Sequence, residues 1–428
     1  MNAAIIFILL MVLMLTGMPI SISLGLTVLT FLFGFTNVPL ESVALKLFTG
    51  IEKFEIMAIP FFILAGNFLT HGGVARRMIN FASAMVGHWH GGLGLAGVLA
   101  CALFAAVSGS SPATVVAIGS ILLPAMVKAG FPNKFGAGVI TTSGALGILI
   151  PPSIVMVMYS VATNTSVGAL FMAGVVPGLA LAGVLGGVTY WRARKFNYPR
   201  LAKASWGERW NAFRASAWGL LLIVIVMGGI YSGVFTPTEA AAMSAVYAFF
   251  VAVFVYKDMK LKDVPKVLLN SANMSAMLLY IITNAVLFSF IMTNENIPQA
   301  LADWMLGNGL GMITFLLAVN VLLLLAGNFM EPSSIVLIFA PILFPVAMKL
   351  GIDPVHFGII MVVNMEVGMC HPPVGLNLYV ASGITKMGIT ELTVAVWPWL
   401  LSMLGFLLVV TYWPGLSLWF PRMLGMVQ

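Results

Sequence analysis

Two related stretches decide the fold: residues 135–153 read FGAGVITTSGALGILIPPS, and residues 357–375 read FGIIMVVNMEVGMCHPPVG. Each is a long apolar run that leads into two consecutive prolines. Proline lacks a backbone N–H, and its ring clashes with the carbonyl group four residues earlier, so it interrupts a helix. We therefore predict a helix that is broken at each proline pair.

The segments around the two proline pairs also correspond. Residues 87–112 begin with glycine and end with proline, and residues 307–332 do the same over an equal length. A further proline precedes each pair by 27 positions, at Pro124 and Pro345. Landmarks that recur in one order indicate an internal duplication. We expect the two copies to be inverted relative to each other, which requires an odd number of membrane crossings between them.

Composition sets the class of protein. The 428 residues are 61% hydrophobic and 8% charged, whereas soluble domains carry about 25% charged residues. A soluble enzyme and a disordered chain are both excluded. With roughly 20 apolar residues per crossing, the length allows on the order of 12 membrane segments, so we predict an all-α polytopic membrane protein. The first apolar run has no preceding Lys or Arg and no A-x-A site, so it is expected to be a retained membrane segment.

Charged residues avoid the predicted membrane depth. Seven of the 20 lysines and arginines lie between Arg192 and Arg214, and four more lie in Lys257–Lys266. The positive-inside rule assigns both segments to the cytoplasmic side, if helices at 215–233 and 236–256 connect them. The cations form no outward basic face, which argues against a nucleic-acid partner. Six stretches contain no charged residue at all: 1–40, 78–127, 135–191, 267–294, 304–330 and 392–421.

A small polar break divides the apolar tract that precedes each proline pair. Residues 91–107 are apolar, 108–112 read Ser-Gly-Ser-Ser-Pro, and 113–127 are again largely apolar. Neither arm comfortably crosses about 30 Å of hydrocarbon. We predict a re-entrant helical hairpin whose tip is buried in protein or faces water. The second copy has the same plan over 312–327, 328–332 and 333–348.

Polar side chains gather at these breaks. Freed carbonyls and hydroxyls offer the oxygen ligands that a small cation prefers, and the following half-helix presents a positive N-terminal end to an anion. Paired interrupted segments in two matched halves indicate the midplane site of a secondary transporter. The candidates are Ser108, Ser110, Ser111, Thr114, Thr141, Thr142 and Ser143 in the first copy, and Asn328, Glu331, Ser333, Ser334, Asn364, Glu366, His371 and Asn377 in the second.

Each candidate also has a structural interpretation. Serine and threonine in membrane helices often bond only to their own backbone. Carboxylates in apolar tracts, here Glu331 and Glu366, are functional candidates by default, but either one could be protonated or structurally paired. His371 could contact substrate, relay a proton with the two glutamates, or bond to a nearby carbonyl. Sodium and proton coupling therefore both stay open at this point.

Other chemistries lack their motifs. The chain has no G-x-x-x-x-G-K-[ST] loop for ATP, no H-E-x-x-H, no C-x-x-C and no G-x-S-x-G elbow. Cys101 and Cys370 lie in apolar runs and are expected to be small buried residues. We therefore expect no enzyme and no cofactor. The residues also leave open a self-sufficient ion-coupled organic anion carrier and, less favoured, a membrane-embedded enzyme.

The motifs resemble those of one family, the large membrane subunits of tripartite ATP-independent periplasmic (TRAP) transporters. The likeness covers nearly the whole chain, and the Glu366 and His371 variant looks most like the C4-dicarboxylate branch. Many relatives carry threonine at the position of His371. The resembling segments are Asn364–Gly383, Ile59–Gly66, Ser108–Thr114, Gly147–Ser153 and Phe235–Ala241.

The resemblance implies a multi-pass permease of the bacterial inner membrane that works with a small four-helix membrane subunit and a periplasmic substrate-binding protein. It implies uptake of an organic acid driven by a sodium gradient, and an elevator-type fold. The implied divisions are N-terminal scaffold helices at 1–87, a first transport repeat at 88–190, a basic loop and scaffold helices at 191–307, a second transport repeat at 308–390, and a C-terminal scaffold helix at 391–428.

The resemblance also implies the site. Sodium would lie between each hairpin tip and the neighbouring helix break, at Ser108, Ser110, Gly147 and Pro151 in the first copy and at Asn328, Glu331, Gly368 and Pro372 in the second. The dicarboxylate would contact Ser110, Ser111, Pro112, Asn328, Glu331, His371 and Asn377. Since the midplane segments contain no lysine or arginine, bound sodium would supply the positive charge that a dianion needs.

Overall fold

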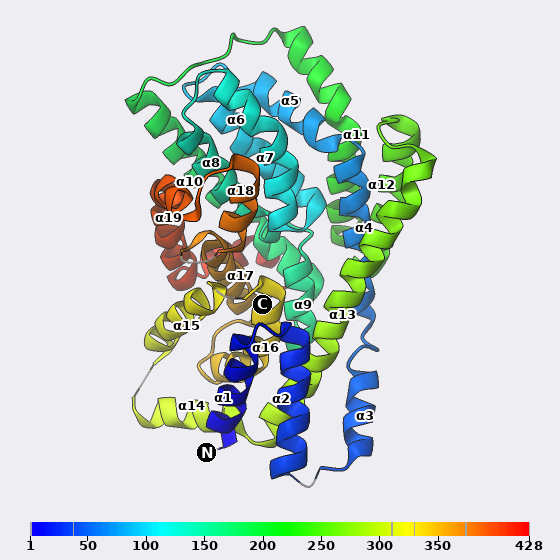
Figure 1. Ribbon diagram of the computed structural model, residues 1–428, viewed down its shortest axis with the longest axis vertical. Helices are drawn as coiled ribbons and strands as arrows, with labels where there is room; N and C mark the ends of the chain where they lie inside the picture. Colours follow the sequence, from blue (N-terminus) through cyan, green and yellow to red (C-terminus); the bar gives the residue numbers. More distant parts are fainter. Residues whose placement is uncertain (1, 37, 310, 329, 373–374, 428) are drawn as a thin grey trace.

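A computed structural model describes residues 2–36, 38–309, 311–328, 330–372 and 375–427. Within these residues every regular element is a helix (Figure 1). Eight helical stretches of these residues are long and apolar enough to cross a membrane, which is fewer than the number expected from length. Two of them, Ser111–Lys128 and Pro332–Lys349, are the second arms of the two predicted hairpins, so the expectation that neither arm is long enough to cross is wrong for these arms.

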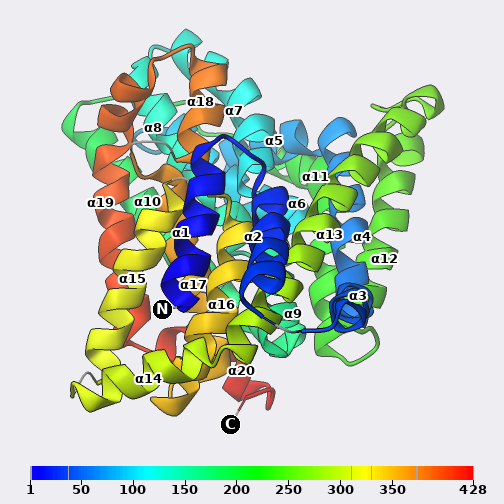
Figure 2. The same ribbon diagram turned by 60° about the horizontal axis from the view of Figure 1, so that its bottom comes forward.

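The first helices build one side of the molecule. Helix α4 packs closely on α12 of the middle segment, and α2 packs on α13. Figure 2 shows α1 and α2 side by side, as their mutual contacts require. The elements are α1 (Asn2–Leu15), α2 (Ile20–Phe35), α3 (Leu40–Thr49), the 3₁₀ turn η1 (Phe54–Met57), α4 (Ala58–His71) and α5 (Val74–Val86).

The first copy of the duplication contains both expected interruptions. Helices α6 and α7 pack against each other across a two-residue break at Gly109 and Ser110. The next helix ends before the proline pair and a new helix starts after it. The elements are α6 (Gly92–Ser108), α7 (Ser111–Lys128), α8 (Asn133–Gly144), the 3₁₀ turn η2 (Ala145–Ile148), α9 (Ile154–Thr163) and α10 (Val167–Lys195).

The middle segment corrects the sequence prediction of a helix at 215–233. Helix α11 begins at Trp206, because Ser205 forms a capping box with Glu208. The Ser205 N–H donates to the Glu208 carboxylate (2.6 Å), and the Glu208 N–H donates to Ser205 Oγ (3.2 Å). The basic segment is therefore largely helical, and only residues 196–205 form the connecting loop.

The second expected helix start is confirmed. Thr236 and Glu239 form a capping box at the beginning of α12, and Pro237 occupies its first position. The middle elements are α11 (Trp206–Tyr231), α12 (Pro237–Phe250), the π-helical turn η3 (Val251–Val255), the 3₁₀ turn η4 (Leu261–Asp263), α13 (Val264–Asn294) and α14 (Ile297–Gly307).

The second copy repeats the plan of the first. Helices α15 and α16 pack against each other across a short break, and α17 ends one residue before the second proline pair. Pro373 of that pair lies outside the described residues. The elements are α15 (Met312–Gly327), α16 (Pro332–Lys349), α17 (Pro354–Cys370) and α18 (Leu376–Thr385), followed by α19 (Ile389–Tyr412) and α20 (Gly415–Met423).

The two broken helices enter the molecule from opposite ends. Lys134, in the first turn of α8, forms an ion pair of 3.3 Å with Glu391 at the start of α19. His356, in the first turn of α17, is hydrogen-bonded to the carbonyl of Thr411 (3.3 Å), one residue before the end of α19. Since α19 is about 36 Å long, α8 and α17 begin far apart and run toward each other.

Candidate binding site at the two helix breaks

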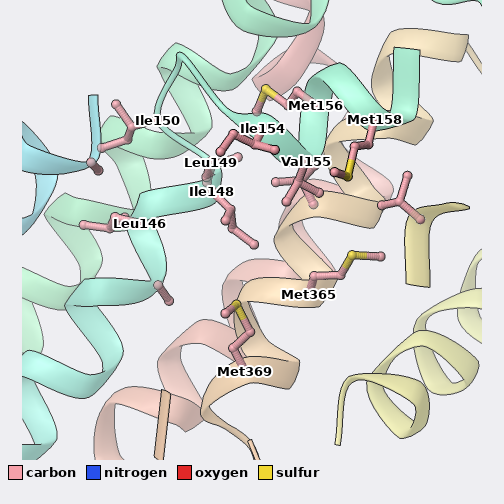
Figure 3. Close-up of a cluster of buried hydrophobic side chains, with 14 of the residues drawn as sticks. Leu146, Ile148, Leu149, Ile150, Ile154, Val155, Met156, Met158, Met365 and Met369 are labelled. Atoms are coloured by element: carbon pink, nitrogen blue, oxygen red, sulfur yellow. The ribbon is translucent and has the colours of Figure 1, made fainter. Parts of the chain in front are cut away.

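The first break lies in an apolar interior. Residues 149–153 separate η2 from α9, and Ser153 Oγ accepts a hydrogen bond from the Met156 N–H (3.4 Å) at the start of the new helix. Figure 3 shows the side chains of η2 and α9 around this break, with Met365 and Met369 of the neighbouring helix α17. The backbone groups freed by the prolines are therefore shielded from solvent and need partners within the protein.

The tip of the α6–α7 hairpin is seated on this break. A Cβ atom at Gly147 would lie 2.6 Å from the Ser110 carbonyl oxygen, and one at Gly109 would lie 3.0 Å from the Pro152 carbonyl oxygen. Gly109 also adopts a positive φ of 60°, which glycine tolerates without strain. On the other side of the tip, Gly66 of α4 packs against the backbone of Ser108. Glycine is thus required where backbone meets backbone.

Hydroxyl groups organise the hairpin tip. The Thr114 hydroxyl donates to the Ser110 carbonyl oxygen (2.8 Å), and Ser108 Oγ lies 2.9 Å from Thr114 Oγ1. Ser108 and Ser111 are buried, whereas Ser110 and Pro112 are partly exposed. Four of the predicted site residues therefore share one tip, next to Gly147.

Asn377 joins the two copies. This residue in the first turn of α18 is fully buried, and its Nδ2 donates to Ser111 Oγ (2.7 Å). Ser111 Oγ also lies 3.1 Å from Asn377 Oδ1, and Nδ2 approaches the Thr141 carbonyl oxygen (3.4 Å). The half-helix that follows the second break therefore contacts the first hairpin tip and the first broken helix. Both residues were predicted from sequence, but their contact was not.

The second hairpin tip meets the second break. A Cβ atom at Gly327 would lie 3.0 Å from the Gly368 Cα atom, so α15 and α17 are in close contact there. The Asn328 side-chain amide is oriented so that its nitrogen faces hydrogen-bond acceptors. This nitrogen donates to the carbonyl oxygens of His371 (3.1 Å) and Pro372 (2.9 Å). Asn328 thus contacts the carbonyls next to the second proline pair, and His371 and Pro372 are partly exposed.

The two glutamates have different surroundings. Glu331 is partly exposed at the residue before α16, and its Oε1 accepts a hydrogen bond from the Ser334 hydroxyl (3.0 Å). Glu366 is fully buried, and neither of its carboxyl oxygens has a hydrogen-bond partner among the described residues. Glu331 is therefore held at the tip, whereas Glu366 lies inside α17.

The other predicted residues lie inside the helices or within the first break. The Thr141 and Thr142 hydroxyls donate to the Ala137 (2.7 Å) and Gly138 (2.9 Å) carbonyls of their own helix. Ser333 lies buried in the first turn of α16, and Pro151 lies buried within the first break. The Ser143 hydroxyl is buried without a partner in the described part of the chain.

One polar residue was missed by the sequence analysis. Asn364 Nδ2 donates to Asn320 Oδ1 (3.0 Å), and Asn320 Nδ2 donates to the Thr411 hydroxyl (2.9 Å). Asn320 lies on α15 and is buried. It is the one amide inside the apolar run of that helix, and this isolation was the signal that could have identified it.

The donor set suits a hard cation better than a transition metal. Within the described residues, no three His, Cys, Asp or Glu side chains come together as a metal cluster. The groups that meet at the two tips are carbonyls, hydroxyls and amides. Such hard oxygen donors suit a hard cation.

We expect Gly147→Ala to destabilise the protein, because the added methyl group meets the Ser110 backbone. Overpacking of this kind costs about 1–3 kcal/mol, which should lower the midpoint of thermal unfolding in detergent. Gly183→Ala on α10 is the matched control, since a Cβ atom there has no neighbour within 4 Å. An unchanged midpoint for Gly147→Ala would contradict the close approach of tip and break.

Within the described residues the protein is helical, with eight potential crossings and two hairpin tips that pack on two helix breaks. This is the architecture of a membrane transport protein. Residues 7–416 match the family described as tripartite ATP-independent periplasmic transporter, DctM component. A C4-dicarboxylate TRAP transporter large permease protein DctM from Rhodobacter capsulatus is 78% identical over 440 residues, with 100% of both chains covered. The protein of that name from Pseudomonas aeruginosa is 57% identical and covers 94% of this chain and 95% of its own length.

The chain therefore belongs to the DctM family of TRAP transporters, which confirms the resemblance drawn from the motifs. It is a multi-pass permease of the bacterial inner membrane and not an enzyme. The Alcanivorax borkumensis YdaH transporter has a similar fold, with a TM-score of 0.62 at 17% identity over 88% of this chain and 89% of that chain.

Proposed function

We propose that this chain is the large permease of a sodium-driven, binding-protein-dependent transporter that imports C4-dicarboxylates or related organic acids. The observation that carries the proposal is the meeting of both hairpin tips with both helix breaks, through carbonyl, hydroxyl and amide groups. The relatives named for C4-dicarboxylate transport support this substrate class.

The charge of the site supports sodium as the coupling ion. No lysine or arginine occurs in residues 135–191 or 304–330, so a dianion must be neutralised by other means. In the proposal, Ser108, Ser110, Gly147 and Pro151 hold one sodium ion, and Asn328, Glu331, Gly368 and Pro372 hold a second. Each ion favours substrate binding, and by linkage the substrate favours ion binding to the same degree.

The substrate lies between the two tips in this scheme. Ser110, Ser111, Pro112, Asn328, Glu331, His371 and Asn377 would surround it. The N-terminal ends of α7, α9, α16 and α18 carry partial positive charge, which stabilises carboxylate groups. The Ser111–Asn377 contact lets one carboxylate touch groups from both copies.

We propose that the hairpins are re-entrant and that the two copies form an inverted repeat, as the opposed entry of α8 and α17 supports. Residues 88–190 and 308–390 would move together against a scaffold of 1–87 and 191–307. Helices α19 and α20 pack on α8, α10 and α17. The predicted C-terminal scaffold segment, 391–428, therefore has a wide contact with the moving unit.

The proposed partners are a small four-helix membrane subunit and a periplasmic substrate-binding protein. Reconstitution tests this directly: the chain is placed in liposomes with an inward sodium gradient and labelled succinate. We expect accumulation only when both partners are added. Uptake by the chain alone would favour a self-sufficient carrier, and uptake that is indifferent to sodium would overturn the proposed coupling.

The ion sites give a sharper prediction. Ser110→Ala and Asn328→Ala should each weaken the apparent sodium affinity of uptake by about tenfold, because each removes a polar group next to an ion. Membrane insertion should stay unchanged. Ser232→Ala and Asn308→Ala are matched controls, since these exposed side chains bond only to their own helix. Unchanged sodium dependence in both site variants would remove these side chains from the ion sites.

Lys53 crosses the proposed boundary between scaffold and moving unit. It lies between α3 and η1, and its Nζ donates to Asn164 Oδ1 (2.7 Å) and to the Val161 carbonyl oxygen at the end of α9. A cation at a helix C-terminus is favourable. Lys53→Met should therefore weaken the contact between the scaffold and the moving unit. The distribution of distances between spin labels at positions 128 and 262 should then shift.

Lys46→Met is the matched control for this measurement, because the Lys46 ammonium lies over Phe290 within the proposed scaffold (5.4 Å). An equal shift in both variants, or no shift in Lys53→Met, would show that Lys53 does not hold the two units together.

A further inference from the structure

A basic and aromatic segment, Trp191–Arg214, covers the end of α10, the connecting loop and the start of α11. Seven of its residues are cationic and one, Glu208, is acidic. The cationic residues are Arg192, Arg194, Lys195, Arg200, Lys203, Arg209 and Arg214. By the positive-inside rule this end of the molecule faces the cytoplasm.

Helix length places the segment at headgroup depth. Helix α10 has 29 residues and α11 has 26, so they are about 44 Å and 39 Å long. The hydrocarbon core is about 30 Å thick, so their cytoplasmic ends project into the headgroup region. Between them, the loop crosses the end of the bundle (Figure 1), where the Leu201 N–H donates to the Gly87 carbonyl oxygen (3.0 Å).

The cations of this segment lack anionic partners. Among the described residues none of the seven forms an ion pair, and the Glu208 carboxylate is already used in the capping box. Arg209 Nε and Nη2 and Arg192 Nε are shielded from solvent, with no hydrogen-bond partner in the described chain. These cations therefore have no anionic partner in the described chain, and a guanidinium group binds phosphate through charge-assisted hydrogen bonds.

Aromatic side chains lie beside these cations. Trp206, Trp210 and Phe213 follow each other at the spacing of one helix face, and Trp206 and Trp210 are 83% and 60% exposed. The Arg209 guanidinium lies over the Trp206 ring at 5.4 Å. Tryptophan prefers the boundary between headgroups and acyl chains, and a cationic helix end with such a face is typical of binding to anionic lipid.

The second cationic segment of this end differs. Asp258 and Asp263 lie among the four lysines of Lys257–Lys266. Asp258 is also the partner of Arg76 and Arg77. Acidic residues thus partly neutralise that region, whereas the 191–214 segment keeps an unpaired positive charge.

We propose that the Trp191–Arg214 segment is a binding site for anionic phospholipids of the cytoplasmic leaflet. The guanidinium groups of Arg192 and Arg209 bind the lipid phosphate, Arg200 and Lys203 add attraction, and Trp206 and Trp210 insert beside the acyl chains. This site is separate from the two helix breaks, and the inference does not depend on the transported substrate.

The test places the full chain in nanodiscs of phosphatidylcholine and phosphatidylglycerol and counts retained lipids of each class by native mass spectrometry. The chain should retain phosphatidylglycerol in preference. The triple variant Arg200→Gln, Lys203→Gln, Arg209→Gln should lose at least about tenfold of that preference, since it removes three cations that attract anionic headgroups. Helix content and monodispersity of each variant establish that it is folded.

The control variant Lys260→Gln, Lys262→Gln, Lys266→Gln removes the same charge from the other segment and should keep the preference. An equal loss in both variants would mean net charge alone attracts the lipid, which would overturn a site at 191–214. An unchanged preference in the first variant would do the same. Millimolar inorganic phosphate should not displace the retained lipid; displacement would overturn the assignment to phospholipid.

Discussion

Peptide groups that lose their helical partners inside a membrane must find others, because water is absent there. In this protein a hairpin tip packs on each break. Gly147 brings the first break against Ser110, and Asn328 donates to the carbonyls of His371 and Pro372. The interruption and the hairpin therefore occur together in both copies.

Because each break packs on a hairpin tip, polar groups of the two copies lie close together. Ser111 and Asn377 are 266 positions apart in the sequence, and their hydrogen bond joins α18, the half-helix after the second break, to the first hairpin tip. Oxygen donors and helix N-termini then converge in a region without lysine or arginine. In the proposed function, sodium binds free backbone carbonyl groups and also balances the negative charge of the substrate. Ion binding and substrate binding then stabilise the same arrangement.

Local signals were sufficient for part of this account. The proline pairs predicted both breaks, the Ser-Gly-Ser-Ser-Pro run predicted the first tip, and the helix expected from position 236 begins at the Thr236–Glu239 capping box. The Ser205–Glu208 capping box starts α11 nine residues earlier than the helix expected from position 215. Contacts such as Ser111–Asn377 and Asn320–Asn364 could not be predicted, because they depend on how helices from distant segments cross.

Sodium-dependent stability of the purified chain tests the central claim most directly. Thermal unfolding would be followed in sodium and in potassium at equal ionic strength, each with and without succinate. We expect sodium to raise the unfolding midpoint, and succinate to raise it further only when sodium is present. Equal midpoints in the two salts, or an equal effect of succinate in potassium, would contradict the proposal that the paired breaks hold a cation and an acid together.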